Sequence, residues 1–172
     1  MPIHQQIFKL CLFLILVTST SSQLCFAQDS KKEKQAAEAE STKNLISNKQ
    51  YVFEAQSTTP TGGKLIQLSY GYAVKVSGDT LISNLPYYGR SYTATLPSEN
   101  NGVNFTSVNF EYKIEERKKG GWDIIMIPED YSDVQKLFLT VFENGSASLL
   151  VISKSKSNIS YSGYITAPKQ KK

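Results

Sequence analysis

The chain has 172 residues, and 19 lysines and arginines against 15 aspartates and glutamates give it a formal net charge of +4. No long basic stripe accompanies this excess, which argues against nucleic-acid binding because that function needs a larger basic surface. The sequence has no phosphate-binding P-loop and no glycine-rich dinucleotide motif. Its two cysteines and single histidine lie near the N-terminus, at Cys11, Cys25 and His4.

Residues 1–27 are typical of a cleavable signal peptide. An apolar run from Leu10 to Val17 leads through a polar stretch to a cleavage site after Ala27. The run is shorter than the roughly 18 residues of a membrane-spanning helix, so we expect no transmembrane segment after cleavage. The alternative is a lipid anchor on Cys25, which Leu24 disfavours because a lipobox has a small residue before its cysteine. We therefore expect an exported protein, periplasmic or secreted.

Cleavage there would remove every cysteine and histidine. The chain from Gln28 onward would then have no thiol nucleophile, no Ser-His-Asp triad and no zinc or copper site built on cysteine or histidine. It would also have no disulfide, so its core would have to stabilise it unaided. We expect no metal and no cofactor.

Residues 28–50 are predicted to be an N-terminal helical segment. Ser30 and Glu33 have the spacing of a capping box, and the residues that follow are rich in helix formers. The apolar face of this helix is thin and is strongest near Ile46. We therefore expect it to pack on the rest of the protein through its last turn only.

From residue 51 to 166 the hydrophobic pattern has a period of two, which is typical of strands. We predict strands at 51–55, 70–76, 80–82, 103–115, 122–127, 137–142, 147–152 and 159–165. Residues 58–63 are predicted to be a turn-rich loop. The pattern slips near Thr106-Ser107, which indicates a bulge or a sharp bend. Asn144-Gly145 favours a two-residue hairpin turn.

Strands 137–142 and 147–152 are apolar on both faces, which a sheet with one solvated face does not need. We therefore expect a mainly β fold, in which the N-terminal helix precedes a single antiparallel β-sandwich or barrel-like domain of about seven to nine strands. Residues 167–172 are predicted to be a basic tail.

Four short motifs follow one another along the chain: Tyr51-Val52-Phe53, LPYYGRSY at 85–92, VFENGSASL at 141–149 and ISYSG at 159–163. Together they resemble the exported Bacteroidota family called domain of unknown function 4251 (DUF4251), over roughly residues 30–165. The resemblance implies export and a small single domain. The family has no assigned activity, so the resemblance implies no catalytic residue.

The LPYYGRSY segment is the main candidate for contact with a ligand. Tyr87, Tyr88 and Tyr92 surround Arg90 in sequence, and tyrosine rings with a guanidinium can stack on sugar faces or bind an anion. The same residues also suit a structural role, in which Arg90 pins the loop to the end of a barrel. Gly89 would then supply a positive φ.

Carboxylates offer two weaker alternatives. A glycosidase needs two carboxyl groups that flank a cleft, and the available residues, all predicted at turns or on outer strand faces, are Asp79, Glu111, Glu115, Asp123, Glu129 and Asp130. The cluster of Glu129, Asp130 and Asp133 could attract calcium, although its spacing does not follow an EF-hand loop. Solvation of the surface is the simpler interpretation of both sets, so we predict no catalytic residue.

Asp79-Thr80-Leu81 resembles the Asp-Ser/Thr-aliphatic acceptor for O-glycosylation of exported Bacteroidota proteins, which makes Thr80 a candidate modification site. For function we predict a non-enzymatic periplasmic or envelope-associated protein that binds a small apolar or carbohydrate-like ligand or an envelope partner. The alternatives are a carboxylate-based hydrolase and a structural or protein-interaction module. A binder should show an aromatic-lined pocket, and an interaction module a filled interior with an exposed apolar patch.

Overall fold

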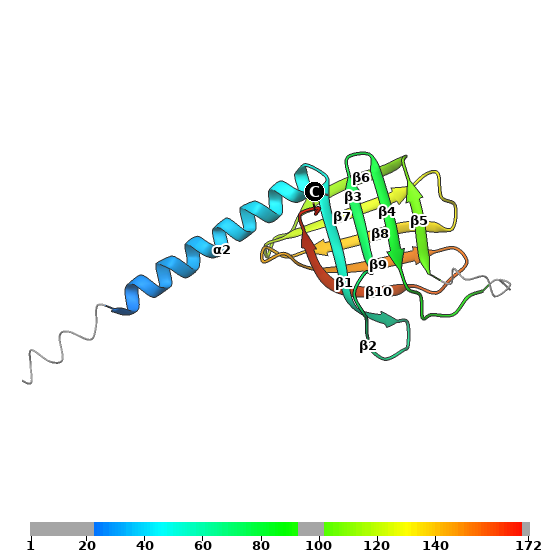
Figure 1. Cartoon of the computed structure of the whole chain (residues 1–172), viewed down its shortest axis with the longest axis horizontal. Coiled ribbons are helices and arrows are strands. Elements are labelled where there is room, and N and C mark those ends of the chain that lie inside the picture. The colour runs from blue at the N-terminus through cyan, green and yellow to red at the C-terminus, as the bar shows by residue number, and fades with distance from the viewer. Residues whose placement is uncertain (1–22, 93–101, 170–172) are drawn as a thin grey trace, which may run out of the picture. The chain divides into compact units, whose positions relative to one another are not determined.

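The computed structural model describes residues 23–92 and 102–169, with side chains from Lys31 onward (Figure 1). Most of the predicted signal peptide, including His4 and Cys11, lies outside the described residues, so its cleavage stays a prediction. The chain divides into two units, residues 1–37 and 38–172. Within the described ranges, no helix combines the length and apolar character needed to cross a membrane.

Helix α2 runs from Gln23 to Ser47. It begins upstream of Ser30, so the predicted capping box lies inside the helix of the full chain, where the preceding residues continue the helical backbone. The helix ends at Ser47, and two residues later Lys49 has a left-handed backbone with φ of 51° and donates its N–H to the carbonyl of Ile46 over 3.1 Å. This is a common way for a helix to end. Ile46, in the last turn, is buried as predicted. The packing extends beyond the last turn, however, because Thr42 is also buried and its hydroxyl donates to the carbonyl of Glu143 over 3.4 Å.

Ten antiparallel strands are formed by the described residues, which confirms the predicted fold class. They are β1 (Gln50–Pro60), β2 (Ile66–Gln67), β3 (Ala73–Ser77), β4 (Thr80–Leu85), β5 (Val103–Ser107), β6 (Phe110–Glu116), β7 (Trp122–Pro128), β8 (Val134–Val141), β9 (Ser146–Ser153) and β10 (Ile159–Thr166). Their order in the sheet is β5-β4-β3-β1-β10-β9-β8-β7-β6, with the short β2 added to β1.

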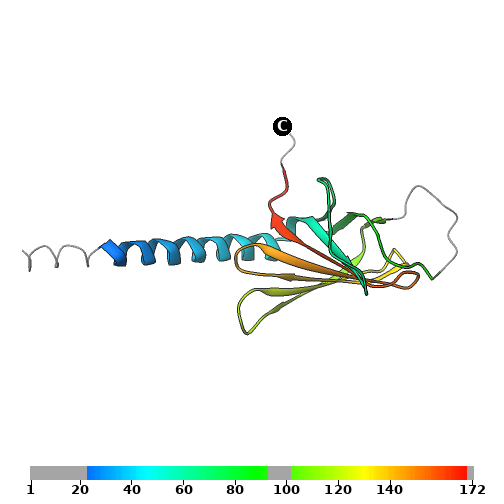
Figure 2. The same ribbon diagram turned by 90° about the horizontal axis from the view of Figure 1, so that it is seen from below.

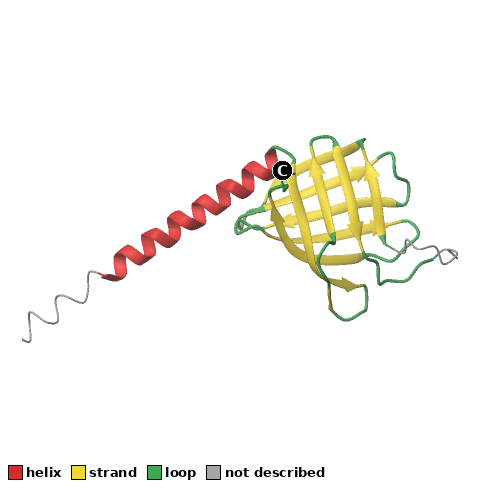
Figure 3. Ribbon diagram, in the orientation of Figure 1, coloured by secondary structure: helices red, strands yellow, loops and turns green. Residues whose placement is uncertain are grey.

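The sheet curls into a nearly closed, barrel-like structure with two layers. In Figure 1, β3 to β5 run across the direction of β6 to β9, and Figure 3 shows the same crossing in yellow. Figure 2 shows the two layers from another side. Strand β1 joins them because it pairs with β3 through Gln50–Glu54 and with β10 through Val52–Pro60. Its register with β10 shifts between Ala55 and Ser57, and such an irregularity bends a strand.

The interior is filled by apolar side chains from alternate positions of the strands, since successive side chains point to opposite faces. The largest fully buried ones are Tyr51, Tyr161, Phe53, Ile46, Leu81, Leu85, Ile124, Met126, Leu137, Leu139, Leu149 and Ile159. Throughout the part of the chain that the structure describes, every buried side-chain nitrogen and oxygen has a hydrogen-bond partner. Residues 28–172 contain no cysteine, so no disulfide lies within this core.

The last turn of α2 is held against one end of the barrel by a small polar cluster. Tyr112 of β6 donates its hydroxyl hydrogen to the carbonyl of Ile46 over 3.1 Å, and its hydroxyl lies 3.3 Å from that of the buried Tyr51. The ammonium group of Lys49 lies 5.1 Å from the centre of the Tyr112 ring. Burial raises the pKa of the Tyr112 hydroxyl to about 12, and it also raises the pKa of Tyr51.

Several strand predictions were wrong in their extent. The strand predicted at 70–76 begins only at Ala73, because Tyr70 and Gly71 form a turn before it. Residues 58–60 belong to β1 rather than to a loop, because they pair with Ile159–Tyr161 of β10. The predicted strand 103–115 is two strands, β5 and β6, which lie at opposite ends of the sheet order. The sharp bend expected near Ser107 is confirmed: the carboxylate of Asp130 accepts hydrogen bonds from the backbone N–H groups of Val108 and Asn109, at 2.8 and 3.3 Å.

The hairpin between β8 and β9 lies where Asn144-Gly145 predicted it, but its turn differs. Gly145 has a φ of 78°, whereas Asn144 is not among the residues with positive φ. A two-residue type I′ turn needs positive φ at both central positions. The N–H of Gly145 instead donates to the carbonyl of Phe142 over 2.9 Å. This contact makes a longer loop in which the glycine supplies the left-handed residue after a tight turn.

The outer face of strands β7 to β9 carries an apolar row. Ile125, Phe138 and Leu150 are direct cross-strand partners, and each is half-buried. The residues next to them in each strand point inward and fill the core. Strands β7 to β9 are therefore apolar on both faces. This row is the outer surface of the barrel wall.

Candidate functional site

The predicted Tyr87–Tyr92 segment is anchored to the loop between β9 and β10. The Tyr87 hydroxyl lies 2.8 Å from the carbonyl oxygen of Arg90 and 2.8 Å from the Ser157 hydroxyl. The backbone of Arg90 exchanges two further hydrogen bonds with Ser157, and the N–H of Tyr92 donates to the carbonyl of Ser155 over 2.7 Å. Tyr87 therefore fastens the loop to the barrel end, a role that the sequence assigned to the Arg90 side chain.

Gly89 is needed here for space, not for its backbone conformation. The prediction of a positive φ was wrong, since Gly89 is not among the glycines with positive φ. A β-carbon at this position would overlap the Tyr87 hydroxyl and would lie 2.7 Å from the Ser157 hydroxyl. The missing side chain lets Tyr87 reach its partners.

The other predicted side chains of this segment face solvent. Tyr88 and Tyr92 keep 48% and 70% of their surface exposed. Arg90 is also exposed, and among the described residues its guanidinium group has no hydrogen bond or ion pair. The structure therefore separates one anchoring tyrosine from three exposed side chains.

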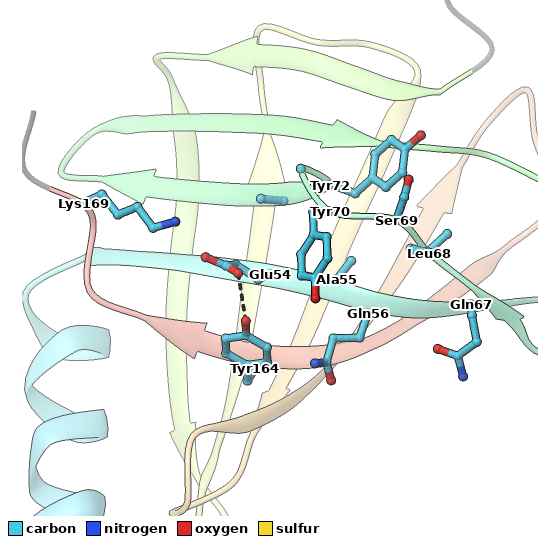
Figure 4. Close-up of a pocket in the computed structure, with 12 residues that line it drawn as sticks. Glu54, Ala55, Gln56, Gln67, Leu68, Ser69, Tyr70, Tyr72, Tyr164 and Lys169 are labelled. Carbon is cyan, nitrogen blue, oxygen red and sulfur yellow. Dashed lines mark hydrogen bonds between the residues drawn. The ribbon is translucent and has the colours of Figure 1, made fainter.

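An open hollow of about 430 Å³ lies elsewhere, over the junction of β1 and β10 (Figure 4). Its lining residues come from β1, from the segment that leads into β3 and from the end of β10: Glu54, Ala55, Gln56, Gln67, Leu68, Ser69, Tyr70, Gly71, Tyr72, Ala73, Tyr164 and Lys169. Three of them are tyrosines, and Tyr70 is fully exposed. We call this the tyrosine hollow.

The polar centre of the tyrosine hollow is a hydrogen bond between two strands. Glu54 and Tyr164 are cross-strand partners, and the Tyr164 hydroxyl donates to Oε2 of Glu54 over 2.9 Å. This bond and the negative charge of Glu54 raise the pKa of Tyr164. Figure 4 shows Lys169 beyond Glu54 at one end of the hollow and Gln67 at the other.

Gly163 makes this arrangement possible, because a β-carbon on it would overlap the backbone carbonyl of Glu54. Glycine inside a strand often marks a bulge or a close backbone approach. Here both occur, since Gly163 faces Ala55 where the register shifts past Gln56. The irregularity lies in the floor of the tyrosine hollow.

Chemically, the tyrosine hollow offers aromatic faces, a carboxylate, an ammonium group and two amide side chains. Among the described residues that line the hollow, Glu54 is the only one with a carboxylate. A glycosidase built on two carboxyl groups would need a second one a few ångströms away.

The acidic cluster near residue 130 is engaged in holding loops. Asp130 binds the backbone at the bend after β5, and Asp133 accepts hydrogen bonds from the backbone N–H and hydroxyl of Ser155. Glu129 accepts a 2.9 Å bond from the side-chain amide of Asn109. Across the described residues, no group of three or more histidine, cysteine, aspartate or glutamate side chains could hold a metal ion.

Thr80 is half-buried at the start of β4, directly after the turn formed by Gly78 and Asp79. Gly78 has a φ of 60°, and its N–H donates to the carbonyl of Lys49 over 2.9 Å. Thr80 thus lies beside the end of helix α2 and belongs to neither candidate site. Its glycosylation stays a prediction.

The fold and the tyrosine hollow together define a small barrel-like β protein with an open surface pocket. The chain belongs to the family described as Domain of unknown function (DUF4251), whose model matches residues 33–165. It is similar to the crystal structure of a DUF4251 family protein from Bacteroides eggerthii DSM 20697, with 15% identity and a TM-score of 0.57. That match covers 77% of this chain and 91% of the other. No curated protein matches the chain.

The tyrosine hollow was not predicted from the sequence. Glu54 and Tyr164 lie 110 positions apart in the sequence, and only the pairing of β1 with β10 brings them together. Tyr70 and Tyr72 were interpreted as strand residues. The available signal was the glycine in ISYSG, because Gly163 interrupts an otherwise regular strand.

Proposed function

We propose that this protein is a non-enzymatic, exported binding protein that holds a carbohydrate-like ligand in the tyrosine hollow. The observation that carries the proposal is the combination of three tyrosines with the Glu54–Tyr164 hydrogen bond around one open pocket. Tyrosine rings offer apolar faces for the C–H face of a sugar, and their hydroxyls stay able to hydrogen-bond. Carboxylate and amide groups accept from and donate to sugar hydroxyls.

The electrostatics of the hollow support a hydroxylated ligand over a purely apolar one. Glu54 uses Oε2 for Tyr164, and in the described residues its other oxygen has no hydrogen-bond partner. A sugar hydroxyl could donate to that oxygen without displacing Tyr164. Burying the carboxylate under an apolar ligand would instead leave this second oxygen without a partner, which is costly.

The test is titration with the neutral disaccharides cellobiose and maltose, followed by nitrogen-15 nuclear magnetic resonance. We expect the side-chain amide signals of Gln56 and Gln67 to shift saturably with at least one sugar. Tyr70→Ala and Glu54→Gln should weaken that shift, whereas Tyr88→Ala, outside the hollow, should not. Shifts that are absent with both sugars, or that survive both hollow substitutions, would rule out this site.

A second candidate is an interaction module that binds an envelope partner. The observation that favours it is the apolar row of Ile125, Phe138 and Leu150 on the outer wall, above a filled interior. Phe138→Lys would place a charge in that row. If capture of a partner from envelope extracts is lost with Phe138→Lys but kept with Tyr70→Ala, this second function is favoured over sugar binding.

A further inference from the structure

We propose that the exposed side chains of Tyr88, Arg90 and Tyr92, here called the Tyr–Arg–Tyr surface, bind an acidic polysaccharide whose sugar rings carry carboxylates. This surface is separate from the tyrosine hollow, with which it shares no residue. The proposal therefore does not depend on the function assigned to the hollow.

The first observation is that the cation on this surface has no partner. Arg90 is exposed between two exposed tyrosines, and within the described part of the chain its guanidinium makes no hydrogen bond or ion pair. A guanidinium fork matches a carboxylate through two parallel hydrogen bonds, which makes arginine well suited to recognise that group. The free fork is thus available to an acidic ligand.

The second observation is that the backbone under this surface is already fixed. Arg90 and Tyr92 donate their backbone N–H groups to Ser157 and Ser155, at 3.1 and 2.7 Å. The Tyr87 hydroxyl also contacts the carbonyl oxygens of Arg90 and Ser157. Because this segment is held before any ligand arrives, binding loses little conformational entropy in ordering the loop.

The surrounding charge is positive. The loop that pairs with this segment carries Lys154 and Lys156, and Ser91 bridges directly to Lys156. Lys156 donates to the carbonyl of Gly102 over 2.9 Å and lies 5.2 Å from the centre of the Tyr87 ring. It forms no ion pair with a carboxylate of the described residues. Asp133 lies beside this loop too, where it accepts hydrogen bonds from the backbone N–H and the hydroxyl of Ser155. A polyanion would therefore be attracted here.

The backbone hydrogen bonds also favour a glycan over an acidic peptide. An extended peptide binds to a strand edge through free backbone N–H and carbonyl groups. The backbone N–H and carbonyl of Arg90 are already bonded to Ser157 and Tyr87. The side chains of this surface must therefore recognise the ligand. A uronic acid offers a C–H face for a tyrosine ring and a carboxylate for the arginine, whereas an acidic peptide offers the carboxylate alone.

The experiment measures binding of three polymers by biolayer interferometry at fixed ionic strength. Polygalacturonate carries both rings and carboxylates, highly methyl-esterified pectin has the same rings with most charges removed, and polyglutamate has carboxylates without rings. We expect polygalacturonate to bind best. Arg90→Gln should weaken it about tenfold or more, and Arg90→Lys should restore only part of the loss.

Matched variants separate this surface from general charge effects and from the hollow. Lys75→Gln removes one exposed positive charge from β3 and should leave binding of polygalacturonate unchanged. Tyr92→Ala should weaken it, and Tyr70→Ala should not. The proposal fails if polyglutamate binds as tightly as polygalacturonate, if Lys75→Gln weakens binding as much as Arg90→Gln, or if polygalacturonate does not bind. Each of these outcomes leaves sugar binding in the hollow to its own test.

Discussion

Gly163 approaches the backbone of Glu54 so closely across the β1–β10 pair that a β-carbon on it would overlap the Glu54 carbonyl oxygen. Because both partners are backbone, neither can move aside as a flexible side chain would. We expect Gly163→Ala to lower the free energy of unfolding by about 3 kcal/mol or more. Urea unfolding measures the change. Ser162→Ala, at the exposed neighbouring position, is the control, and an equal effect of both variants would contradict the prediction.

Tyr87 and Tyr88 form a matched pair that differs in hydrogen bonding. Removing the Tyr87 hydroxyl deletes its contacts with the carbonyls of Arg90 and Ser157, at 2.8 and 3.0 Å. We expect Tyr87→Phe to cost about 1 kcal/mol and to speed hydrogen exchange of the Ser157 amide. Tyr88→Phe should change neither quantity. If the two variants behave alike, Tyr87 does not anchor the segment.

The hydroxyl of Tyr112 should contribute to holding the last turn of α2. Tyr112→Phe removes the 3.1 Å bond to the Ile46 carbonyl and the contact with the Tyr51 hydroxyl. We expect a loss of about 1 kcal/mol in the free energy of unfolding, measured by urea denaturation. The control is Tyr70→Phe, since Tyr70 is fully exposed. A Tyr112→Phe variant as stable as this control would refute the role.

The buried tyrosines should make the protein less stable at high pH. Burial raises the pKa of Tyr112 from 10.0 to about 12, so between these values the unfolded chain loses a proton that the folded protein keeps. The contribution of Tyr112 to the free energy of unfolding is therefore complete below pH 10 and is lost as the pH rises towards 12. The total loss is about 1.4 kcal/mol for each unit by which the folded pKa exceeds the unfolded one. Urea unfolding across this range should show a shallower decline for Tyr112→Phe. Identical slopes would contradict the assignment.

Glycosylation of Thr80 is expected in the protein isolated from its own cells. Thr80 follows an exposed turn, where Asp79 is accessible to an enzyme. The intact mass should exceed that of the bare chain, and Thr80→Ala should return it to the bare value. A native protein with the bare mass would end this prediction.

The architecture was predictable because alternation of buried and exposed residues is a local pattern. Trp122 to Pro128, for example, alternates without a fault along β7. Pairing between distant strands is not local, and nothing in residues 51–60 indicates that their partner is the last strand. The tyrosine hollow depends on that pairing, so Glu54 and Tyr164 could not be joined from sequence. The Tyr87–Tyr92 segment was found because its aromatic residues are close together in the chain.

Errors in the prediction arose where sterics and loops decide the structure. Gly89 is small because Tyr87 needs the space, which no rule about positive φ reveals. The single strand predicted at 103–115 is divided because Asp130, from a different loop, binds the amides at the bend. In both cases the deciding contact comes from another side chain.

The sheet order also constrains how this protein reaches its native state. Strands β3 to β5 and β6 to β10 each pair with their neighbours in sequence, whereas β1 pairs with β10 across most of the domain. Contacts between residues so distant in sequence slow folding, because a long loop must close before they form. The barrel therefore cannot close until residues 159–166 are available. A chain that still lacks its last strand is left with this edge of β1 unpaired, so the two layers of the barrel cannot yet be joined.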